Sequence, residues 1–248
     1  MKIGVAGYTG RLGQLLVAEL QANKYPSIEF VGGSSRTARK ESFNVYTSPE
    51  DLFHVSDCVI DFTTPEATLH HIHTAAKTKK KLIVGTTGLA EEHHKALAEA
   101  AKKTAIIQAA NTSVGVNLLL ALVEEAAKKL DRAWDIEIFE AHHKNKVDAP
   151  SGTALALGAA AKEGRGQVGN FANFRTGKRV DGDIGFAVSR GGDVVGEHMV
   201  TFFGAGERLE LGHKATDRAL FARGAIQAAQ WLHGQPAGLY TMRNVLGL

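Results

Sequence analysis

The first 110 residues alternate between two hydrophobic periods, and this alternation limits the possible folds more than any other feature. Short runs rich in β-branched residues are typical of buried parallel strands, and amphipathic stretches between several of them are typical of helices. The predicted strands are Lys2–Ala6, Ile28–Gly32, Cys58–Phe62, Leu82–Gly85 and Ala105–Gln108. The predicted helices are Leu12–Ala22, Pro65–Lys77 and Glu91–Lys103. Strand–helix alternation of this kind predicts a doubly wound α/β fold.

Two helix starts are marked by a hydroxyl residue followed by proline. Thr64 precedes Pro65, and Ser48 precedes Pro49 at the start of a shorter helix. A threonine or serine is a favoured N-cap, and proline is tolerated at the first helical position because its missing N–H has no partner there anyway. Both sites therefore predict helix N-termini.

The rhythm changes after about residue 112. A long helix is expected over Val116–Leu130, then a strand over Trp134–Ala141 and a small helix near Thr153–Lys162. The segment Gly164–Gly182 is polar and glycine-rich, which is typical of a mobile loop.

The remaining segments predict a second sheet and a closing helix. Runs at Ile184–Ser189 and Val194–Phe203 are joined by Arg190-Gly-Gly-Asp193, a hairpin signal, and a third run, Arg208–Leu211, suggests an antiparallel or mixed sheet. The helix Asp217–Leu232 is strongly apolar and needs a surface to pack against.

Charge and composition exclude several classes of protein. The formal net charge is only +3, from 29 basic and 26 acidic side chains, which does not favour nucleic acid as a partner. The single cysteine, Cys58, cannot form an intramolecular disulfide and is expected to be a small buried residue. No apolar run is long enough for a membrane span or a signal peptide, so we expect a soluble cytoplasmic protein.

A glycine-rich loop separates the first strand from the first helix. Its residues are Gly7, Tyr8, Thr9, Gly10, Arg11, Leu12 and Gly13. The glycines permit close approach of a pyrophosphate, and the helix N-terminus supplies unpaired N–H groups and a positive dipole end. The spacing is G-x-x-G-x-x-G, and its place between strand and helix predicts dinucleotide binding. Arg11 is either a phosphate contact or a solvated arginine.

The tip of the second strand indicates which dinucleotide binds. An NAD site usually carries a carboxylate there, but this tip has Ser34, Ser35 and Arg36, with Arg39 and Lys40 beyond. Hydroxyls and cations would accommodate a 2′-phosphate. We therefore expect NADPH to be preferred, with NADH possible.

A long motif lies in the middle of the chain. It reads Glu140-Ala-His-His-Lys-Asn-Lys-Val-Asp-Ala-Pro-Ser-Gly-Thr153 and resembles the signature of the 4-hydroxy-tetrahydrodipicolinate reductase family at every fixed position. Further agreement, spread over nearly the whole chain, is found at Asp61–Glu66, Gly85–Gly88, Ala110–Asn117, Gly196–His198, Gly206–Glu210, His213–Ala215 and Met242–Leu246.

The resemblance implies an NAD(P)H-dependent oxidoreductase of lysine and diaminopimelate biosynthesis. In this reaction the hydroxylated cyclic imine loses water and accepts hydride at C4, giving tetrahydrodipicolinate. By similarity His142 is the general acid/base, and Lys146 is the companion cation that protonates or polarises the ring nitrogen. Histidine suits proton transfer near neutral pH. The resemblance also implies a homotetramer built through the sheets of the substrate domain.

Further residues are assigned to the substrate, a small dicarboxylate, and to the cofactor. The expected substrate contacts are His143, Ser151, Gly152, Thr153, Arg218 and Thr87. The N–H groups of Gly152 and Thr153 precede a helix and form a natural carboxylate cradle. If the chain stays extended after His142, residues 142, 144 and 146 share one face. The expected cofactor contacts beyond the glycine loop and the strand tip are Phe62, Thr63, Gly85, Thr86, Thr87, Ala110, Asn111 and Ser113.

Three other interpretations compete with this one. His70, His71 and His73, with His93 and His94, could suggest a metal site, but no third ligand is evident, so solvated helix faces and no metal are expected. Another NADP-dependent dehydrogenase, acting on aspartate or its semialdehyde, would share the fold. A non-catalytic dinucleotide sensor would not need His142 and Lys146.

The expected architecture has two domains. A Rossmann-type dinucleotide-binding domain comprises residues 1–112 and 219–248, and an α+β substrate-binding and oligomerisation domain with a mixed sheet comprises residues 113–218. The active site is expected in the cleft between them.

Overall fold

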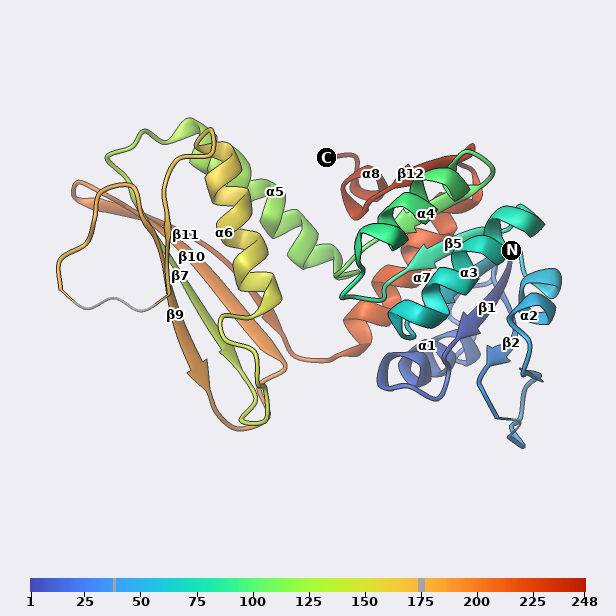
Figure 1. The fold of residues 1–248 in the computed structure, drawn as a ribbon. Coiled ribbons are helices and arrows are strands. Elements are labelled where there is room, and N and C mark those ends of the chain that lie inside the picture. Colours follow the sequence, from blue (N-terminus) through green and yellow to red (C-terminus); the bar gives the residue numbers. More distant parts are fainter. Residues whose placement is uncertain (38, 174–176) are drawn as a thin grey trace. The chain divides into compact units, whose positions relative to one another are not determined.

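The computed structural model describes residues 1–37, 39–173 and 177–248, and these form two compact units (Figure 1). Unit 1 comprises Met1–Val114 with Arg218–Leu248, and unit 2 comprises Gly115–Asp217. The chain therefore leaves unit 1 once and returns to it near its end.

A parallel sheet forms the centre of unit 1. Its strands are β1 (Lys2–Ala6), β2 (Glu29–Ser34), β3 (Val45–Tyr46), β4 (Cys58–Asp61), β5 (Lys81–Val84), β6 (Ala105–Gln108) and β12 (Gly238–Tyr240). In the described part of unit 1 they make a seven-stranded sheet in the order β12-β6-β5-β4-β1-β2-β3, with every pair parallel. The longer strands were predicted. The two- and three-residue strands β3 and β12 were missed because such short segments show no periodicity.

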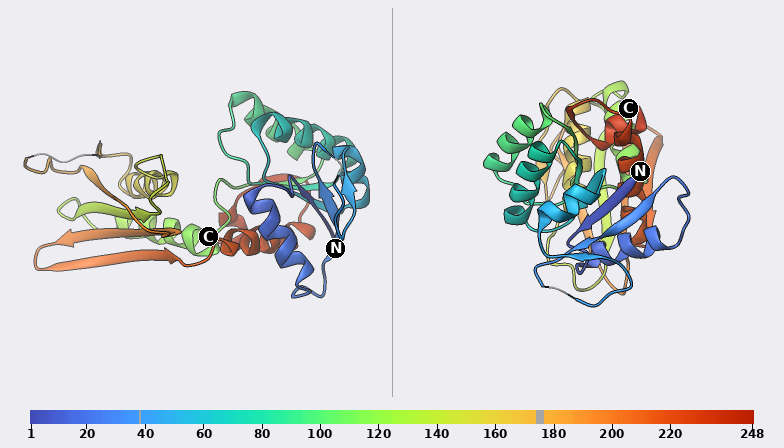
Figure 2. Two further views of the ribbon diagram at one scale, coloured as in Figure 1. Left: turned by 90° about the horizontal axis from the view of Figure 1, so that it is seen from below. Right: turned by 90° about the vertical axis from the view of Figure 1, so that its right-hand side faces the viewer.

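Helices cover both faces of this sheet, as the left view of Figure 2 shows. One core joins Ile3, Val5 and Ile60 to α1 (Arg11–Gln21) and α7 (Ala219–His233). On the opposite face, Val59 and Leu82 pack against a second layer of helices, which are α2 (Pro49–Val55), α3 (Pro65–Thr78) and α4 (Glu91–Ala101). A short helix, α8 (Met242–Leu246), ends the chain. The predicted doubly wound fold is confirmed, and the apolar closing helix finds its partner in α1 and the sheet.

The hydroxyl–proline helix starts are confirmed. The side chain of Thr64 accepts a hydrogen bond from the Ala67 N–H, and Ser48 accepts one from the Asp51 N–H, each at 3.4 Å. Both helices therefore begin where the local sequence predicts.

Unit 2 is an α+β layer structure with a mixed sheet. Its elements are α5 (Val114–Lys129, which begins at the unit boundary), β7 (Asp135–His142), α6 (Gly152–Gly164), β8 (Phe171–Ala172), β9 (Ile184–Arg190), β10 (Gly196–Gly204) and β11 (Glu207–Ala215). In the part of the unit that is described, the strand order is β11-β10-β7-β9-β8. Helices α5 and α6 pack on one face through Val123 and Leu157, which contact Ile136, Ile138 and Val200 in one core. The predicted α+β class is confirmed.

The predicted hairpin between β9 and β10 is wrong. Strand β7 lies between them and pairs parallel with β9 and antiparallel with β10. The connection binds the end of β7, since the Gly191 N–H donates to the His142 carbonyl at 2.9 Å. Two strand spacings are only about 10 Å, which a connection of a few residues can span. The local turn signal therefore does not distinguish a hairpin from a connection over one strand. The hairpin that does form joins β10 to β11.

The glycine-rich segment 164–182 is only partly irregular. Phe171–Ala172 forms β8 and pairs with β9, so the prediction of a loop throughout is wrong. Residues 174–176 lie outside the described residues. In the described part of the chain, no helix combines the length and the apolar character needed to cross a membrane.

Candidate active site

Strand β7 carries two ionisable residues, Glu140 and His142, on its buried face. Its burial alternates, so that Ile136, Ile138, Glu140 and His142 all face inward. The first pair is apolar and packs in the core, whereas the second pair is ionisable and needs polar partners. The strand ends at His142, and the Lys146 N–H donates to the His143 carbonyl at 3.1 Å. The condition under which residues 142, 144 and 146 would share one face is therefore not met, because a turn intervenes.

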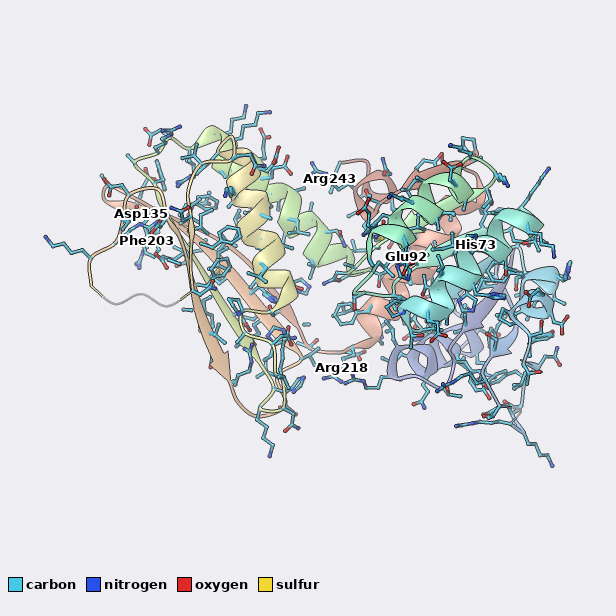
Figure 3. The ribbon with its side chains drawn as sticks, in the orientation of Figure 1. His73, Glu92, Asp135, Phe203, Arg218 and Arg243 are labelled. Carbon is cyan, nitrogen blue, oxygen red and sulfur yellow. The ribbon has the colours of Figure 1, made fainter. Side chains whose placement is uncertain are left out.

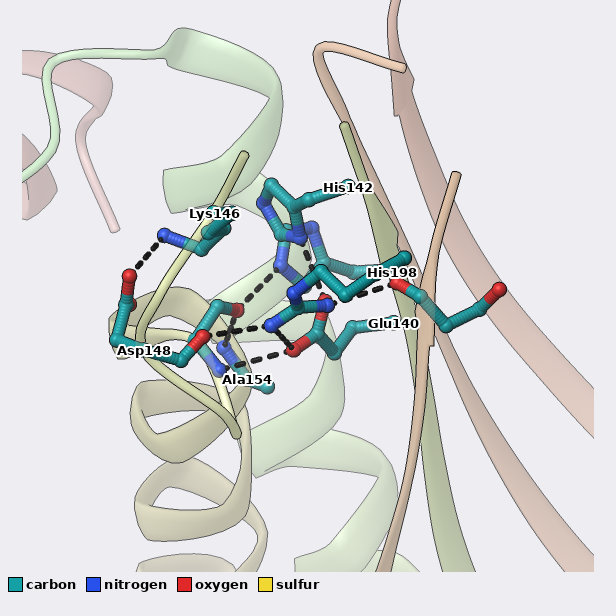
Figure 4. Close-up of polar contacts among 9 residues, drawn as sticks. Glu140, His142, Lys146, Asp148, Ala154 and His198 are labelled. Carbon is teal, nitrogen blue, oxygen red and sulfur yellow. Dashed lines mark hydrogen bonds and ion pairs between the residues drawn. The ribbon is translucent and has the colours of Figure 1, made fainter. Parts of the chain in front are cut away.

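The Glu140 carboxylate is fully buried and accepts four hydrogen bonds (Figure 4). Its Oε1 accepts from Arg190 Nη2 at 2.8 Å and from the Ser151 N–H at 3.0 Å. Its Oε2 accepts from Arg190 Nη1 at 2.7 Å and lies 2.5 Å from His142 Nδ1. A buried carboxylate needs such compensation because its desolvation is costly. Arg190 also donates to the Asp148 carbonyl at 2.6 Å, which ties this centre to the loop after β7.

His142 lies at the edge of this network with its Nδ1 turned inward. Its ring packs edge-on against His198, with centroids 5.1 Å apart. Gly196 lies beside the outer nitrogen, since a Cβ added there would come within 3.0 Å of His142 Nε2. A side chain at this position would therefore crowd the nitrogen that Glu140 does not engage.

The pKa values in the network follow from burial and from these contacts. Burial would raise the pKa of Glu140, but the hydrogen bonds from Arg190, His142 and the Ser151 N–H outweigh it and hold that pKa below its usual value. Burial lowers the pKa of His142, and the hydrogen bond and charge of Glu140 oppose this without cancelling it. Burial and the neighbouring His142 lower the pKa of His198 to about 4, so His198 is neutral near pH 7.

Ser151 links this network to helix α6. Its Oγ accepts from the Ala154 N–H at 3.2 Å as the N-cap and lies 3.0 Å from His198 Nε2. The side chain is buried and fully engaged, whereas Gly152 is exposed at the first turn of the helix. Of the predicted substrate contacts Ser151, Gly152 and Thr153, the helix turn faces solvent and the serine hydroxyl does not.

Lys146 is half-buried beside the same helix turn. Its Nζ donates to Asp148 Oδ1 at 2.8 Å. The hydrogen bond from Lys146 lowers the pKa of Asp148, with a smaller contribution from the Gly152 N–H. One carboxylate of the chain thus contacts two groups that were predicted to bind a substrate carboxylate. The Glu140 centre (Glu140, His142, Ser151, Arg190 and His198), with Lys146 beside it, can hold an anion and move a proton.

The predicted cofactor loop of unit 1 has the geometry of a phosphate cradle. Gly7 has a φ of +74°, and a Cβ at Gly13 would lie 2.2 Å from the Gly7 carbonyl oxygen. Both positions therefore require glycine. The N-cap of α1 is Gly10, which has no side chain to cap the first helical N–H groups. Tyr8 is buried against Gly33 and Phe43, so it serves as packing, while Arg11 is exposed.

The other predicted cofactor residues follow the carboxyl ends of strands in the same sheet. Ser34 ends β2, and its carbonyl accepts from the Gly7 N–H at 3.0 Å. Arg36 is exposed beyond it. The remaining predicted contacts follow β4, β5 and β6 and are Phe62, Thr63, Gly85, Thr86, Thr87, Ala110, Asn111 and Ser113. Parallel strands bring these segments to one edge, where ligands of open α/β sheets bind. Thr87 and Arg218, predicted substrate contacts, both belong to unit 1, and Arg218 is the exposed N-cap of α7 (Figure 3).

A buried carboxylate also supports that edge. Asp61 ends β4 with no exposed surface and accepts hydrogen bonds from the hydroxyls of Thr63 and Thr68, at 2.6 and 2.7 Å. Thr68 also contacts Thr86 at 2.8 Å. His71 Nδ1 lies 3.1 Å from Asp61 Oδ2, within ion-pair range but without hydrogen-bond geometry. This Asp61 centre (Asp61, Thr63, Thr68, His71 and Thr86) joins the loops that follow β4 and β5.

The sequence predicts that the histidines of α3 and α4 are solvated, and this prediction is wrong for two of them. His71 and His93 are buried. His93 accepts from the Ala90 N–H through Nδ1, and its Nε2 lies 3.0 Å from the Pro65 carbonyl oxygen. The His93 ring faces inward because it satisfies polar groups at the start of α4 and of α3, whereas the His71 ring faces the buried Asp61 carboxylate within ion-pair range. Among the described residues, no group of three or more His, Cys, Asp or Glu side chains could hold a metal ion.

Comparison with known proteins identifies the family. The family model described as dihydrodipicolinate reductase, N-terminus, matches residues 1–112, and the model described as dihydrodipicolinate reductase, C-terminus, matches residues 115–246. The chain belongs to the dihydrodipicolinate reductase family. It is thus an oxidoreductase of a lysine-pathway family, and the predicted resemblance is confirmed.

Relatives of this reductase match along nearly their whole length. The chain is 49% identical over 253 residues to the 4-hydroxy-tetrahydrodipicolinate reductase of Zymomonas mobilis, covering 100% of this chain and 98% of the relative. It is 47% identical over 267 residues to the enzyme of that name from Methylocella silvestris, covering 100% and 97%. A solved structure of dipicolinate-bound dihydrodipicolinate reductase from Paenisporosarcina sp. TG-14 shares the fold, with a TM-score of 0.83, 23% identity and 97% of each chain covered.

Several residues of the candidate site were not predicted from the sequence. Glu140 could have been found, because it shares the inward face of β7 with His142 by period two. Arg190 and His198 lie opposite His142 and Glu140 only because β7 is inserted between β9 and β10. No local signal indicates that insertion.

Proposed function

We propose that this chain reduces 4-hydroxy-tetrahydrodipicolinate to tetrahydrodipicolinate, with His142 as general acid/base and Lys146 as the companion cation. The observation that carries the proposal is the Glu140–His142 pair beside Lys146 and the start of α6, in a member of this reductase family. The nicotinamide, when bound, supplies hydride to C4 of the ring after loss of water. The residues of the chain hold the dicarboxylate and supply the proton.

Proton delivery is the role proposed for His142. Hydride addition to an unsaturated imine builds negative charge that a proton must neutralise. Nδ1 of His142 is engaged by Glu140, so Nε2, beside Gly196, is the nitrogen that meets the substrate. Lys146 has a mobile cationic head that can polarise the ring nitrogen or bind a carboxylate.

Substrate recognition is proposed to use an exchange of carboxylates. Lys146 and the Gly152 N–H contact Asp148 in the free chain. A substrate carboxylate has the same charge and hydrogen-bonding capacity as Asp148, so it can replace Asp148 on these groups. Thr153 at the same helix turn and His143 complete the proposed contacts, and Ser151 contributes by capping the helix. Arg218 and Thr87 are proposed contacts from unit 1.

The cofactor of the proposed reaction is a pyridine nucleotide, and NADPH is proposed as the preferred one. The glycine loop and the bare N-terminus of α1 fit a pyrophosphate, and Arg36 with Ser34 and Ser35 fits a 2′-phosphate. Glu41 approaches this region, since it accepts a hydrogen bond from the Tyr8 hydroxyl at 3.3 Å. Its negative charge opposes a phosphate and so reduces the preference that Arg36 provides.

Mutation of Arg36 tests the cofactor preference. Arg36→Ala should raise the KM for NADPH about tenfold, the value of one charge-assisted contact, and leave the KM for NADH nearly unchanged. Steady-state assays with each nucleotide measure the ratio. An equal effect on both would refute the 2′-phosphate assignment.

A homotetramer in the cytoplasm is the proposed working state. The face of the unit 2 sheet opposite α5 and α6 carries exposed Phe139 and half-buried Met199 and Phe203. An apolar patch of this kind suits association between copies of the chain. Light scattering coupled to size exclusion should give four times the chain mass, and a monomer would refute it.

The decisive experiment is oxidation of NADPH at 340 nm with the freshly generated product of dihydrodipicolinate synthase as substrate, repeated with NADH. Rapid oxidation is expected. No oxidation, with the nucleotide still binding, would exclude the proposed reaction and favour another dicarboxylate imine or a sensor.

A further inference from the structure

We infer that Glu140, held by Arg190, is a positioning residue that keeps a proton on Nδ1 of His142, so that Nε2 is the nitrogen that exchanges a proton with the substrate. The inference rests on the proposed function and deepens it. Neither Glu140 nor Arg190 was assigned a role in catalysis from the sequence.

The arrangement of donors around Glu140 carries the inference. Each carboxylate oxygen accepts two hydrogen bonds, and three of the four donors, two guanidinium N–H groups and one backbone N–H, cannot act as acceptors. A carboxylate surrounded by these donors stays ionised. In agreement, the hydrogen bonds hold the pKa of Glu140 below its usual value although burial would raise it. An ionised carboxylate only accepts, so His142 Nδ1, at 2.5 Å, must donate.

A fixed proton on Nδ1 determines where the chemistry occurs. In neutral imidazole one nitrogen carries the proton, so Nε2 of His142 is then the base, and in the imidazolium its proton is the one that leaves. The ring is also held in place, because Nδ1 is bonded and His198 packs against it in a T-shaped contact. Orientation of this kind avoids the loss of rate that a misplaced proton donor causes.

Arg190 contributes by fixing Glu140 and not by binding substrate. Both of its terminal nitrogens are engaged, by Glu140 and by the carbonyls of Ser189 and Asp148. Its hydrogen bonds to Glu140 raise its own pKa, which is consistent with a permanent ion pair. Without Arg190 the carboxylate would lose half of its donors.

The charged groups around His142 predict opposite shifts in the pH dependence of the rate for two variants. Glu140 raises its pKa, and Lys146 and Arg190 lower it, while His198 contacts the ring in a neutral form near pH 7. A general acid is active when protonated, so the rate falls as pH rises through the pKa of His142. Loss of Glu140 should therefore move this fall to lower pH, and loss of Arg190 should move it to higher pH.

The experiment measures kcat/KM against pH for the wild-type enzyme, Glu140→Gln and Arg190→Met. Glu140→Gln should lower kcat/KM on the order of 100-fold and shift the alkaline limb down by about one pH unit. Arg190→Met should shift the limb upward. Glu125→Gln, in an exposed pair with Lys129 on α5, is the matched control and should change neither quantity. Shifts in the same direction, or reduced rates with unchanged limbs, would overturn the inference, because a purely structural role predicts those results.

A second measurement observes the proton in the wild-type enzyme itself and does not depend on activity. Solid-state ¹⁵N NMR of the histidine-labelled wild-type enzyme above pH 7 should show His142 with its proton on Nδ1, the signal being assigned by its loss in His142→Asn. A proton on Nε2 would overturn the inference even in an active enzyme. If the wild-type enzyme does not reduce the substrate but shows the Nδ1 proton, the proposed function fails and the positioning of His142 stands.

Discussion

Each unit of this reductase buries a carboxylate near the carboxyl end of a strand and places a histidine beside it, but the two carboxylates have different partners. Asp61 is held by threonine hydroxyls and a backbone N–H, and His71 near it lacks hydrogen-bond geometry. Glu140 is held by a guanidinium and bonds His142 directly at 2.5 Å. Neutral donors from the loop after β4 and from α3 suit an anchor for these segments. A cationic partner keeps the carboxylate ionised while it orients a ring whose other nitrogen can react.

Replacement of each histidine by alanine should show the largest difference between the two centres. His142→Ala should lower kcat about 10²- to 10⁴-fold, the usual value of a general acid/base, and leave the Kd for NADPH nearly intact. His71→Ala should change kcat only a few-fold and lower the melting temperature instead. Steady-state kinetics and calorimetry measure both. Unchanged turnover in His142→Ala would remove its catalytic role.

The anchoring role of Asp61 should appear as stability. In Asp61→Asn an amide N–H₂ replaces an oxygen that accepts from Thr63 or Thr68, so a donor faces a donor. Loss of such a buried contact should cost about 1–3 kcal/mol in the free energy of unfolding, measured by urea denaturation. Asp51→Asn, on the exposed side of α2, is the control and should stay within about 0.5 kcal/mol. A cost no greater than that of the control would contradict the assignment.

The helix caps beside the two centres compare them on a finer scale. Ser151→Ala removes the cap of α6 and also the partner of His198, whereas Thr64→Ala removes only the cap of α3. A lost cap lowers the free energy of unfolding by about 1 kcal/mol. The loss in Ser151→Ala should be larger than the loss in Thr64→Ala, because a buried histidine nitrogen also loses its partner. Thermal unfolding of both variants measures the order, and the reverse order would count against the His198 contact.

A smaller difference between the centres should appear in the free energy of unfolding as the pH is lowered. His198 has a pKa of about 4 in the folded chain, because burial and His142 disfavour its charge, against about 6.5 in an unfolded chain. The unfolded chain therefore binds the extra proton first, so this contribution to stability is lost as pH falls from about 6.5 toward 4. His142 and Glu140 act in the same direction. In His198→Gln the decline measured by urea denaturation at pH 7 and pH 4.5 should be shallower, and an equal decline would refute the assignment.

The local elements and the residue types of the site follow from short stretches of the sequence. Strand–helix alternation, the caps at Ser48 and Thr64, the glycine loop and the inward period of β7 are all set by neighbours along the chain, so they were predictable. The motif around His142 identified the family for the same reason, since it is contiguous.

The neighbours of each strand and the partners of each polar group depend instead on contacts between distant segments. The turn at 190–193 is compatible with a hairpin, and the insertion of β7 between β9 and β10 depends on burial of Ile136 and Ile138 against α5 and α6. That insertion brings Arg190 and His198 to Glu140 from strands distant in sequence. Periodicity encodes which face of a strand is buried, whereas pairing is decided by contacts between distant segments, and so the partners of His142 could not be predicted from the sequence.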